Sequence, residues 1–579
     1  MRAHLVSLSP SCRSLAVALL FCVSVAGAEL RVEGVDDAIA SNVQSFVALA
    51  SEPCDAPRWL VQRRFRNVVK EAKTALEPFG YYDPVIDTTL EPGGECWQAT
   101  VRINAGEPVL LRDVNITLAS PTADQDNFSD LITSTRLVPG APLRHSEYDS
   151  LKEALQVRAA ERGYAEAQFL QNTIDVWPSE RAADIALNFE TGPRYDFGDI
   201  TFEQSFLDDR MVSAYLEFEP GTPYDNRLLL DAYNDLSLSG YFSRIELLPD
   251  IERSTDKRIP VRVQLEPADR IEYTVGAGIS TDTGLRARAG FHNRRVNSRG
   301  HRLKSDLAVS KVIQALVVEY RKPLTDPRSE WLSYTAGLTA EDTDTSKSEE
   351  ARVGVRRSKR ISRNWMRTLA LDLTYDRYDI GGVEDSSRLV LPAVLYDHKR
   401  ADRDIFPTRG RRLSLELRGT AEFIGSSTTF LQAIVSGRIV RSLNEDSRLL
   451  ARATFGLTAK SDFDELPPFV RFFAGGDDSV RGFGFETLGP VDDAGNVIGG
   501  SNLLVASIEY EHRLRGNFLW AAFVDAGNAF DGTDVDPAVG AGLGLKWLSP
   551  LGPLRFYLAH PLNKSDRDVR LHIRLGPDL

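Results

Sequence analysis

The second half of the chain alternates apolar and polar residues with a period of two. Clear examples are Leu369 to Tyr375 (LALDLTY) and Leu413 to Leu417 (LSLEL). Because successive side chains of a β-strand point to opposite faces, this pattern predicts strands with one apolar and one polar face. From about residue 270 onward there are about 16 such segments and no helical pattern. We expect strands near residues 271, 284, 301, 314, 330, 348, 366, 387, 411, 427, 447, 502, 518, 539, 554 and 569.

A soluble β-sandwich and a closed membrane barrel both show such alternation, but an even number of strands over about 310 residues favours the barrel. After residue 28 no apolar run approaches the length of a membrane-spanning helix, so membrane insertion would have to use strands. Near the expected strand ends lie four residues that suit an aromatic girdle, Trp331, Trp365, Trp520 and Trp547. About 40 residues, from Lys460 to Ser501, separate the eleventh and twelfth strands, and so long a connection is usually functional or disordered.

The first half of the chain has helical spacing that ends three times in a Gly-Tyr pair. The pairs are 83 and 77 residues apart, at Gly80-Tyr81, Gly163-Tyr164 and Gly240-Tyr241. Glycine in this place predicts a left-handed residue just after a helix. The repetition predicts three related domains, each in the order strand, helix, helix, strand, strand. The second and third units also share a Pro-Gly-x-Pro turn, at 139–142 and 220–223.

Residues 1–28 are typical of a secretory signal peptide. An apolar run from Leu15 to Val25 precedes the small-x-small sequence Ala26 to Ala28. Phe21 before Cys22 does not fit a lipoprotein cleavage box, so we expect release rather than anchoring. Removing this segment takes away two arginines and no acid, which changes the formal charge from −13 to −15 and argues against nucleic acid as a partner.

Two cysteines remain after the signal peptide, Cys54 and Cys96, both in the first unit. In an oxidising periplasm a disulfide between them is the favoured interpretation, and it would stabilise a small domain by about 3–4 kcal/mol. A two-cysteine metal site is less favoured because no nearby histidine completes it.

We expect no catalytic residue, cofactor or metal site. The chain has eight histidines and no Gly-x-Ser-x-Gly nucleophile elbow. Asp531, Asp534 and Asp536 could attract calcium, but no glutamate follows at EF-hand spacing, so a solvated loop is favoured. The letters GGDD at 475–478 also occur in nucleotide-cyclase loops, but a secreted barrel has no supply of nucleoside triphosphate.

The repeated units resemble the polypeptide-transport-associated (POTRA) domain. The resemblance implies POTRA domains at residues 29–108, 109–194 and 195–268, followed by a barrel at 269–579. The expected fold is therefore three α+β POTRA domains and a 16-stranded antiparallel transmembrane β-barrel. POTRA domains imply binding by β-augmentation, in which an extended segment pairs with a sheet edge. Three unrelated small α/β domains are the alternative, and the shared order, spacing and turn residues disfavour it.

The long connection in the barrel carries a further resemblance. It contains GGDDSVRGF at 475–483, and the VRGF of Val480 to Phe483 is similar to the signature loop of the BamA-like outer-membrane assembly superfamily. Other matching motifs are Phe406 to Gly410, Phe523 to Asn528 and Gly542 to Pro553. Within the superfamily, the three POTRA units, the length and the ending LGPDL most resemble the TamA family, the outer-membrane subunit of the translocation and assembly module.

The resemblance places Arg481 inside the barrel, against the wall residues Asp525, Phe523 and Glu509. Burying a guanidinium without a carboxylate partner costs several kcal/mol, so we expect a bidentate pair between Arg481 and Asp525. Gly482 would allow a tight bend. Val480, Arg481, Gly482 and Phe483 would then form a structural latch in the lumen. A solvated loop arginine is the alternative.

The resemblance also implies a mechanism without ATP. In this superfamily the first and last strands, here Ile271 to Ser280 and Val569 to Leu575, meet in a weak seam that can open laterally. An opened seam exposes unpaired backbone groups, which an incoming client strand can satisfy. Gly276, Gly278 and Gly576 would weaken the seam. Ordinary barrel packing is the other explanation for these glycines.

The implied function is that of an insertase or translocase for outer-membrane and autotransporter-type client proteins. It would lie in the lipid bilayer of the outer membrane with its POTRA domains in the periplasm, and would work with a TamB-like periplasmic protein anchored in the inner membrane. The outer-membrane end of a phospholipid conduit is an open second hypothesis. A two-partner-secretion exporter usually has two POTRA units and a plug helix, and a passive porin would not need three POTRA units, so both fit less well.

Overall fold

The computed structural model describes residues 29–91, 96–119, 126–403, 406–549, 552–564 and 569–575. The expected signal peptide and Gly576 lie outside these residues. The chain forms two compact units. One unit contains the two N-terminal small sheets, and the other contains the third small sheet and the barrel. Two short segments, 223–226 and 255–258, group with the N-terminal unit. Among the described helices none is both long and apolar enough to cross a membrane.

The first repeat differs from expectation in its helices. Its elements are β1 (Glu29–Glu33), α1 (Asp37–Phe46), α2 (Arg58–Phe65), α3 (Val68–Leu76), β2 (Val85–Glu91) and β3 (Gln98–Asn104). The predicted second helix is split at Arg66 and Asn67, and Asn67 becomes the N-cap of α3. The sheet has the order β1-β3-β2, with β1 parallel to β3. It packs one face against apolar residues of α1 and α3, among them Val43 and Ala72, which are fully buried.

The second and third repeats follow the expected order of strand, helix, helix, strand, strand. The second contains β4 (Leu110–Ala119), α4 (Ser129–Thr133), α5 (His145–Arg162), β5 (Gln168–Trp177) and β6 (Ala182–Glu190). The third contains β7 (Asp196–Glu203), α6 (Asp209–Ser213), α7 (Asn226–Ser239), β8 (Phe242–Pro249) and β9 (Arg258–Pro267). Their strand orders, β4-β6-β5 and β7-β9-β8, match that of the first sheet, so the three units share one α+β topology.

The three Gly-Tyr pairs terminate helical segments as predicted. Gly80, Gly163 and Gly240 have φ angles of 91°, 84° and 71°, in the left-handed region that favours glycine. The tyrosines after the second and third glycines, Tyr164 and Tyr241, are buried in their domains. The glycine therefore turns the chain while the tyrosine fixes the turn to the core.

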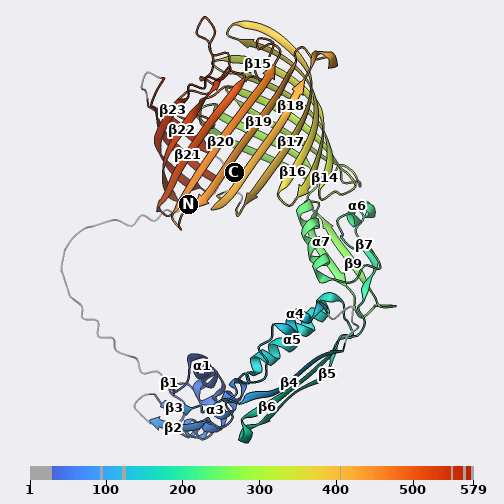
Figure 1. Cartoon of the computed structure of the whole chain (residues 1–579), viewed down its shortest axis with the longest axis vertical. Helices are drawn as coiled ribbons and strands as arrows, with labels where there is room; N and C mark the ends of the chain where they lie inside the picture. The colour runs from blue at the N-terminus through green and yellow to red at the C-terminus, as the bar shows by residue number, and fades with distance from the viewer. Residues whose placement is uncertain are drawn as a thin grey trace, which may run out of the picture. The chain divides into compact units, whose positions relative to one another are not determined.

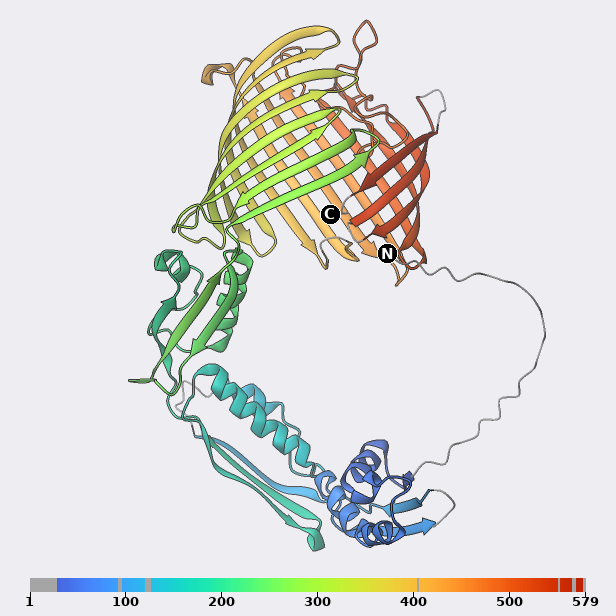
Figure 2. The same ribbon diagram turned by 180° about the vertical axis from the view of Figure 1, so that it is seen from behind.

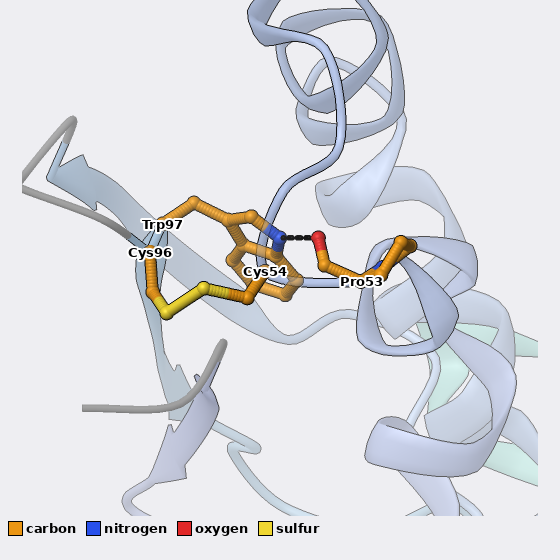
Figure 3. The surroundings of a disulfide bond; sticks show 4 residues. All are labelled: Pro53, Cys54, Cys96 and Trp97. Carbon is orange, nitrogen blue, oxygen red and sulfur yellow. Dashed lines mark hydrogen bonds between the residues drawn. A yellow bond between two sulfur atoms is a disulfide. The ribbon is translucent and has the colours of Figure 1, made fainter. Parts of the chain in front are cut away.

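A disulfide joins Cys54 and Cys96 in the first repeat, connecting the segment before α2 with the start of β3 (Figure 3). Beside it, the indole N–H of Trp97 donates a hydrogen bond to the carbonyl of Pro53, 3.1 Å away. Because Trp97 is buried, its indole N–H needs a hydrogen-bond acceptor inside the domain, and the Pro53 carbonyl provides it.

The second half of the chain is a closed antiparallel barrel of 16 strands, β10 to β25 (Figure 1). Fourteen of the 16 strands begin within two residues of the predicted positions. The strands are β10 (Ile271–Ser280), β11 (Gly284–Asn293), β12 (Arg302–Ser310), β13 (Ile313–Pro323), β14 (Glu330–Asp342), β15 (Ser346–Ser362), β16 (Trp365–Ile380), β17 (Val383–Ala401), β18 (Arg409–Thr420), β19 (Phe430–Ser442), β20 (Ser447–Lys460), β21 (Asn502–Arg515), β22 (Phe518–Phe530), β23 (Ala538–Ser549), β24 (Gly552–Pro561) and β25 (Arg570–Leu575).

The two larger errors are at β17 and β19, which begin four residues earlier and three residues later than predicted. The start of β17 contains Glu384 and Asp385, which show no apolar alternation, so hydrophobicity did not reveal that the hairpin continues there. A strand needs an apolar face only where it meets lipid.

The alternating pattern places polar side chains inside the barrel. Along β16, Leu371 and Leu373 are about half exposed on the outer surface, whereas Asp372, Thr374 and Asp376 between and after them are buried. Because the apolar side chains face outward, the wall can lie in lipid while the interior remains polar and charged.

Removing the disulfide should destabilise the first repeat selectively. Its closed loop has a sequence separation of 42 residues, for which chain entropy predicts a loss of about 4 kcal/mol in Cys54→Ala. Native-state hydrogen exchange of the β3 amides in the full-length protein measures this change. The double variant Cys54→Ala/Cys96→Ala should behave like the single variant, because both remove the same bond. Unchanged β3 exchange would show that the bond contributes no stability.

Candidate functional site

The candidate site is the connection between β20 and β21, residues 461–501, called here the luminal loop. Its central part is buried against the barrel wall: Val480 is fully buried and Phe483 is 6% exposed. These two residues form an apolar cluster with Val505 of β21 and Ala538 of β23. Apolar contact with the wall therefore holds the loop inside the barrel.

The guanidinium of Arg481 forms a bidentate pair with Asp525 of β22. Its Nε and one terminal nitrogen lie 2.7 and 2.9 Å from the two carboxylate oxygens. The other terminal nitrogen lies 2.6 Å from Glu509 of β21. The backbone N–H of Arg481 also donates to Asp525, 3.0 Å away. Both the side chain and the backbone of this residue are thus fixed to the wall.

Two aromatic rings complete the socket around Arg481. The guanidinium carbon lies 3.5 Å from the ring centre of Phe523 and 4.6 Å from that of Tyr557, the latter on β24. The Tyr557 hydroxyl donates to Glu509, 2.6 Å away. Cation–π contacts add to the ion pairs because the site is desolvated. The structure therefore brings together all three predicted wall residues, and it adds Tyr557, which sequence reasoning missed.

The charge of Arg481 is secured by its partners. Burial alone would lower the pKa of its guanidinium, but the hydrogen bonds to Asp525 and the nearby carboxylate of Glu509 outweigh burial and raise the pKa above its ordinary value. Arg481 is 4% exposed and Asp525 is fully buried. An ion pair taken out of water in this way depends on good geometry and on saturated hydrogen bonds, and this pair has both.

Glycines allow the loop to approach the wall this closely. Gly482 has a φ of 100°, and a Cβ there would lie 3.2 Å from the backbone nitrogen of Pro561. On the wall side, a Cβ at Gly540 of β23 would overlap the carbonyl oxygen of Arg481. Gly540 escaped sequence reasoning because its role depends on a contact with the loop about 60 residues earlier.

Comparison with known proteins identifies the two kinds of domain in the chain. Residues 296–577 match the Omp85 superfamily domain, and residues 29–105 match the POTRA domain called TamA domain 1. The chain carries an Omp85 superfamily barrel. Such a barrel lies in the outer membrane, with its POTRA domains in the periplasm.

Curated relatives of this chain are distant. It is 23% identical to "Outer membrane protein assembly factor BamA" of Neisseria meningitidis serogroup B, over 89% of this chain and 73% of that protein. It is 21% identical to the protein of the same name from Nitratidesulfovibrio vulgaris, over 63% of this chain and 48% of that protein, so it spans about half the length of this relative. The crystal structure of BamA from Haemophilus ducreyi lacking POTRA domains 1–3 has a similar fold, with a TM-score of 0.69 and 18% identity over 81% of this chain and 99% of that one.

A second group of residues in the Omp85 barrel lies close to Arg481. Asp282, Asp477 and His572 each offer one possible metal-ligand atom, all within 4.8 Å of one another. Both ring nitrogens of His572 are already engaged, one with Asp477 at 2.5 Å and one with the backbone N–H of Gly482 at 3.0 Å. These residues therefore form a hydrogen-bond network rather than an open set of metal ligands.

Replacing Arg481 should release the luminal loop. Arg481→Ala removes the nearest cation from the buried Asp525 and Glu509. The cations left beside them are more distant, Arg452 at 3.6 Å from Asp525 and Lys546 at 4.0 Å from Glu509. Breaking a buried pair on one side costs about 3–5 kcal/mol. Arg481→Lys should have a smaller effect, because an ammonium retains the charge but not the bidentate geometry. Urea unfolding of the purified protein in vesicles, with proteolysis of the loop, measures both changes. Arg515→Ala, at an exposed position on β21, is the matched control. Equal stability of Arg481→Ala and wild type would contradict a wall-anchored loop.

The loop should also make stability depend on pH. Burial raises the pKa of Glu486 to about 8, and the carboxylates of Glu341 and Asp282 add to this rise. The folded state therefore keeps this proton up to about pH 8, while an unfolded chain loses it near the ordinary glutamate pKa of 4.5. The contribution is fully present below that lower pH and is lost as pH rises through the folded pKa. Glu486→Gln should thus have a higher Tm than wild type at pH 9 and a similar Tm at pH 5.

The control for this measurement is Glu465→Gln, an exposed position in the same loop. It should follow the wild-type pH profile. Parallel Tm profiles of wild type and Glu486→Gln across this range would show that Glu486 titrates as an ordinary carboxylate.

Proposed function

We propose that this Omp85 barrel inserts or translocates outer-membrane and autotransporter-type proteins by opening laterally at its seam, the junction of β10 and β25. Figure 2 shows the first and last strands of the barrel side by side. Among the described residues the two strands share one ladder pair, Ser280 with Arg574. Every other neighbouring pair in the barrel shares at least six, as β24 and β25 do. This difference carries the proposal.

The physical reason lies in the solvent around the barrel. In lipid an unpaired backbone N–H or C=O costs several kcal/mol, because no water replaces the missing partner. Most of β10 faces the seam without a described ladder partner, so its edge favours any strand that can pair with it. A client strand that pairs there gains these hydrogen bonds, and insertion proceeds without a catalytic residue or ATP.

Glycine in β10 supports an adaptable edge. A Cβ at Gly276 would meet nothing within 4 Å, so packing does not require glycine at this position. At Gly278 the Cβ would lie 3.1 Å from the side chain of Arg286, where some packing restriction exists. Glycine weakens a strand interior by its conformational freedom, which suits a strand that must exchange partners.

The small sheets offer edges for extended segments before they reach the barrel. In the order β1-β3-β2, and in the equivalent orders of the other two sheets, the middle strand is paired on both sides and the outer strands are not. Extended peptides can therefore add to β1 or β2 by backbone hydrogen bonds. The match of the first repeat to TamA domain 1 favours a TamB-like periplasmic protein as the partner, and the BamA relatives favour outer-membrane clients.

Locking the seam tests the proposal. Next to the paired Ser280 and Arg574, antiparallel register places Ile279 opposite Leu575, so Ile279→Cys/Leu575→Cys should form a disulfide across the seam. In cells that depend on this variant, surface display of an autotransporter should fall severalfold and recover on reduction. The control is Leu431→Cys/Ala459→Cys, a register pair of β19 and β20 that should leave display unchanged.

Outer-membrane phospholipid balance is measured in the same cells. If display survives the locked seam while lipid balance fails, a phospholipid conduit replaces the insertase proposal. If both survive, lateral opening is not the mechanism for either cargo.

A further inference from the structure

The luminal loop bridges the two strands of the seam through a single carboxylate. Asp477 accepts hydrogen bonds from the hydroxyls of Ser280 and Thr281, at the end of β10, over 2.8 and 2.9 Å. It also accepts one from Nδ1 of His572 on β25, over 2.5 Å. Thr281 extends the bridge, because its hydroxyl accepts from the backbone N–H of Ile573 at 3.3 Å. Side chains thus connect strands that the backbone joins weakly.

The state of His572 follows from these contacts. Its Nε2 accepts from the backbone N–H of Gly482, so that nitrogen carries no proton. The proton is then on Nδ1, where it is donated to Asp477. His572 is 3% exposed, so bulk solvent has little access to either hydrogen bond. One residue of β25 is therefore held at two points of the loop, one of them next to Arg481.

The neighbouring Asp478 supports the same junction. It pairs with Arg574, the β25 residue that shares the ladder pair with Ser280. It also lies 3.3 Å from Arg438 of β19 and 3.9 Å from Arg452 of β20, across the lumen. The loop therefore ties the last strand to a part of the wall remote from the seam.

The backbone of the loop is shaped for this approach. Gly475 and Gly476 have φ angles of 101° and 99°. A Cβ at Gly476 would lie 2.7 Å from the carboxylate of Asp282, which accepts the backbone N–H of Asp477 at 2.7 Å. Larger residues would push Asp477 away from the end of β10.

Asp477 is suited to this role by its charge. Burial would raise the pKa of its carboxyl, but the hydrogen bonds from His572 and Ser280 outweigh burial and lower it. An ionised carboxylate accepts three hydrogen bonds at once and makes each of them charge-assisted.

We propose that Asp477 is a positioning residue that holds the seam closed by joining β10 and β25 to the luminal loop. Because Arg481 anchors the same loop four residues later, opening of the seam requires Asp477 to release at least one strand while the anchor stays in place. This inference deepens the proposed function. Only the purpose of a closed seam rests on that function, because closure by Asp477 is measured without a client.

Hydrogen exchange of the full-length protein in lipid nanodiscs tests this role. In Asp477→Ala, exchange in β10 and β25 should become at least tenfold faster, while β21 and β22, which hold Arg481, keep their wild-type rates. Asp477→Asn retains one acceptor oxygen and should give an intermediate rate. Asp493→Ala, an exposed aspartate of the same loop, is the matched control and should match wild type.

Two results would overturn the proposal. Unchanged exchange in β10 would show that Asp477 does not hold the seam. Equal acceleration in β10, β21 and β22 would show that the substitution only unfolds the loop. A double-mutant comparison adds a second check: in a Ser280→Ala background the fold-change caused by Asp477→Ala should shrink, because one of its partners is already missing. If exchange responds as expected but a locked seam still displays clients, Asp477 keeps its role and the proposed function fails.

Discussion

The structure depends on one constraint: in a bilayer every backbone hydrogen-bonding group needs a partner within the protein. A barrel meets this demand by pairing each strand with two neighbours, and closure is complete only if the first strand also pairs with the last. Here the junction of the first and last strands has the weakest backbone pairing, with a single described ladder pair at the C-terminal end of β10. Among the described residues, side chains of the luminal loop add contacts to this junction from inside the barrel.

A loop can do this only if it is itself immobile. Apolar contacts would hold it loosely, since they are not directional, whereas the pairing of Arg481 with Asp525 and Glu509 specifies both position and orientation. Such a buried pair is costly to form, and replacing it with apolar residues can even stabilise a protein. Its value in this barrel is therefore geometric. It places Asp477 and Gly482 within hydrogen-bond distance of the seam.

Sequence predicted those features that depend on local pattern. Alternation of apolar and polar residues located the strands because lipid outside and polar groups inside constrain successive residues in turn. It failed at the start of β17, where Glu384 and Asp385 show no such alternation. The helix break at Asn67 has no such signal. Arg481 and its wall partners were found through motif resemblance. Tyr557 and His572 were not, because their roles depend on the register that brings β24 and β25 to the loop. The GGDD motif was recognised in the sequence, but no local pattern predicts that Asp477 contacts β25, which begins about 90 residues later.

The spacing within the loop has a mechanical consequence. Asp477, Asp478, Arg481 and Gly482 lie within six residues, and together they contact β10, β25 and the remote wall. In the proposed mechanism a client strand that pairs with the backbone of β10 would displace β25, and with it the bridge that Asp477 makes between the two strands. It would not compete with the pair between Arg481 and Asp525, which faces β21 and β22. Opening one strand therefore need not release the loop. Once such a client had left, the anchored loop would present Asp477 to Ser280 again at high effective concentration, so closure would be an intramolecular step. A weak backbone junction combined with a fixed side-chain bridge would thus allow the barrel to open locally while the rest of its wall stays paired.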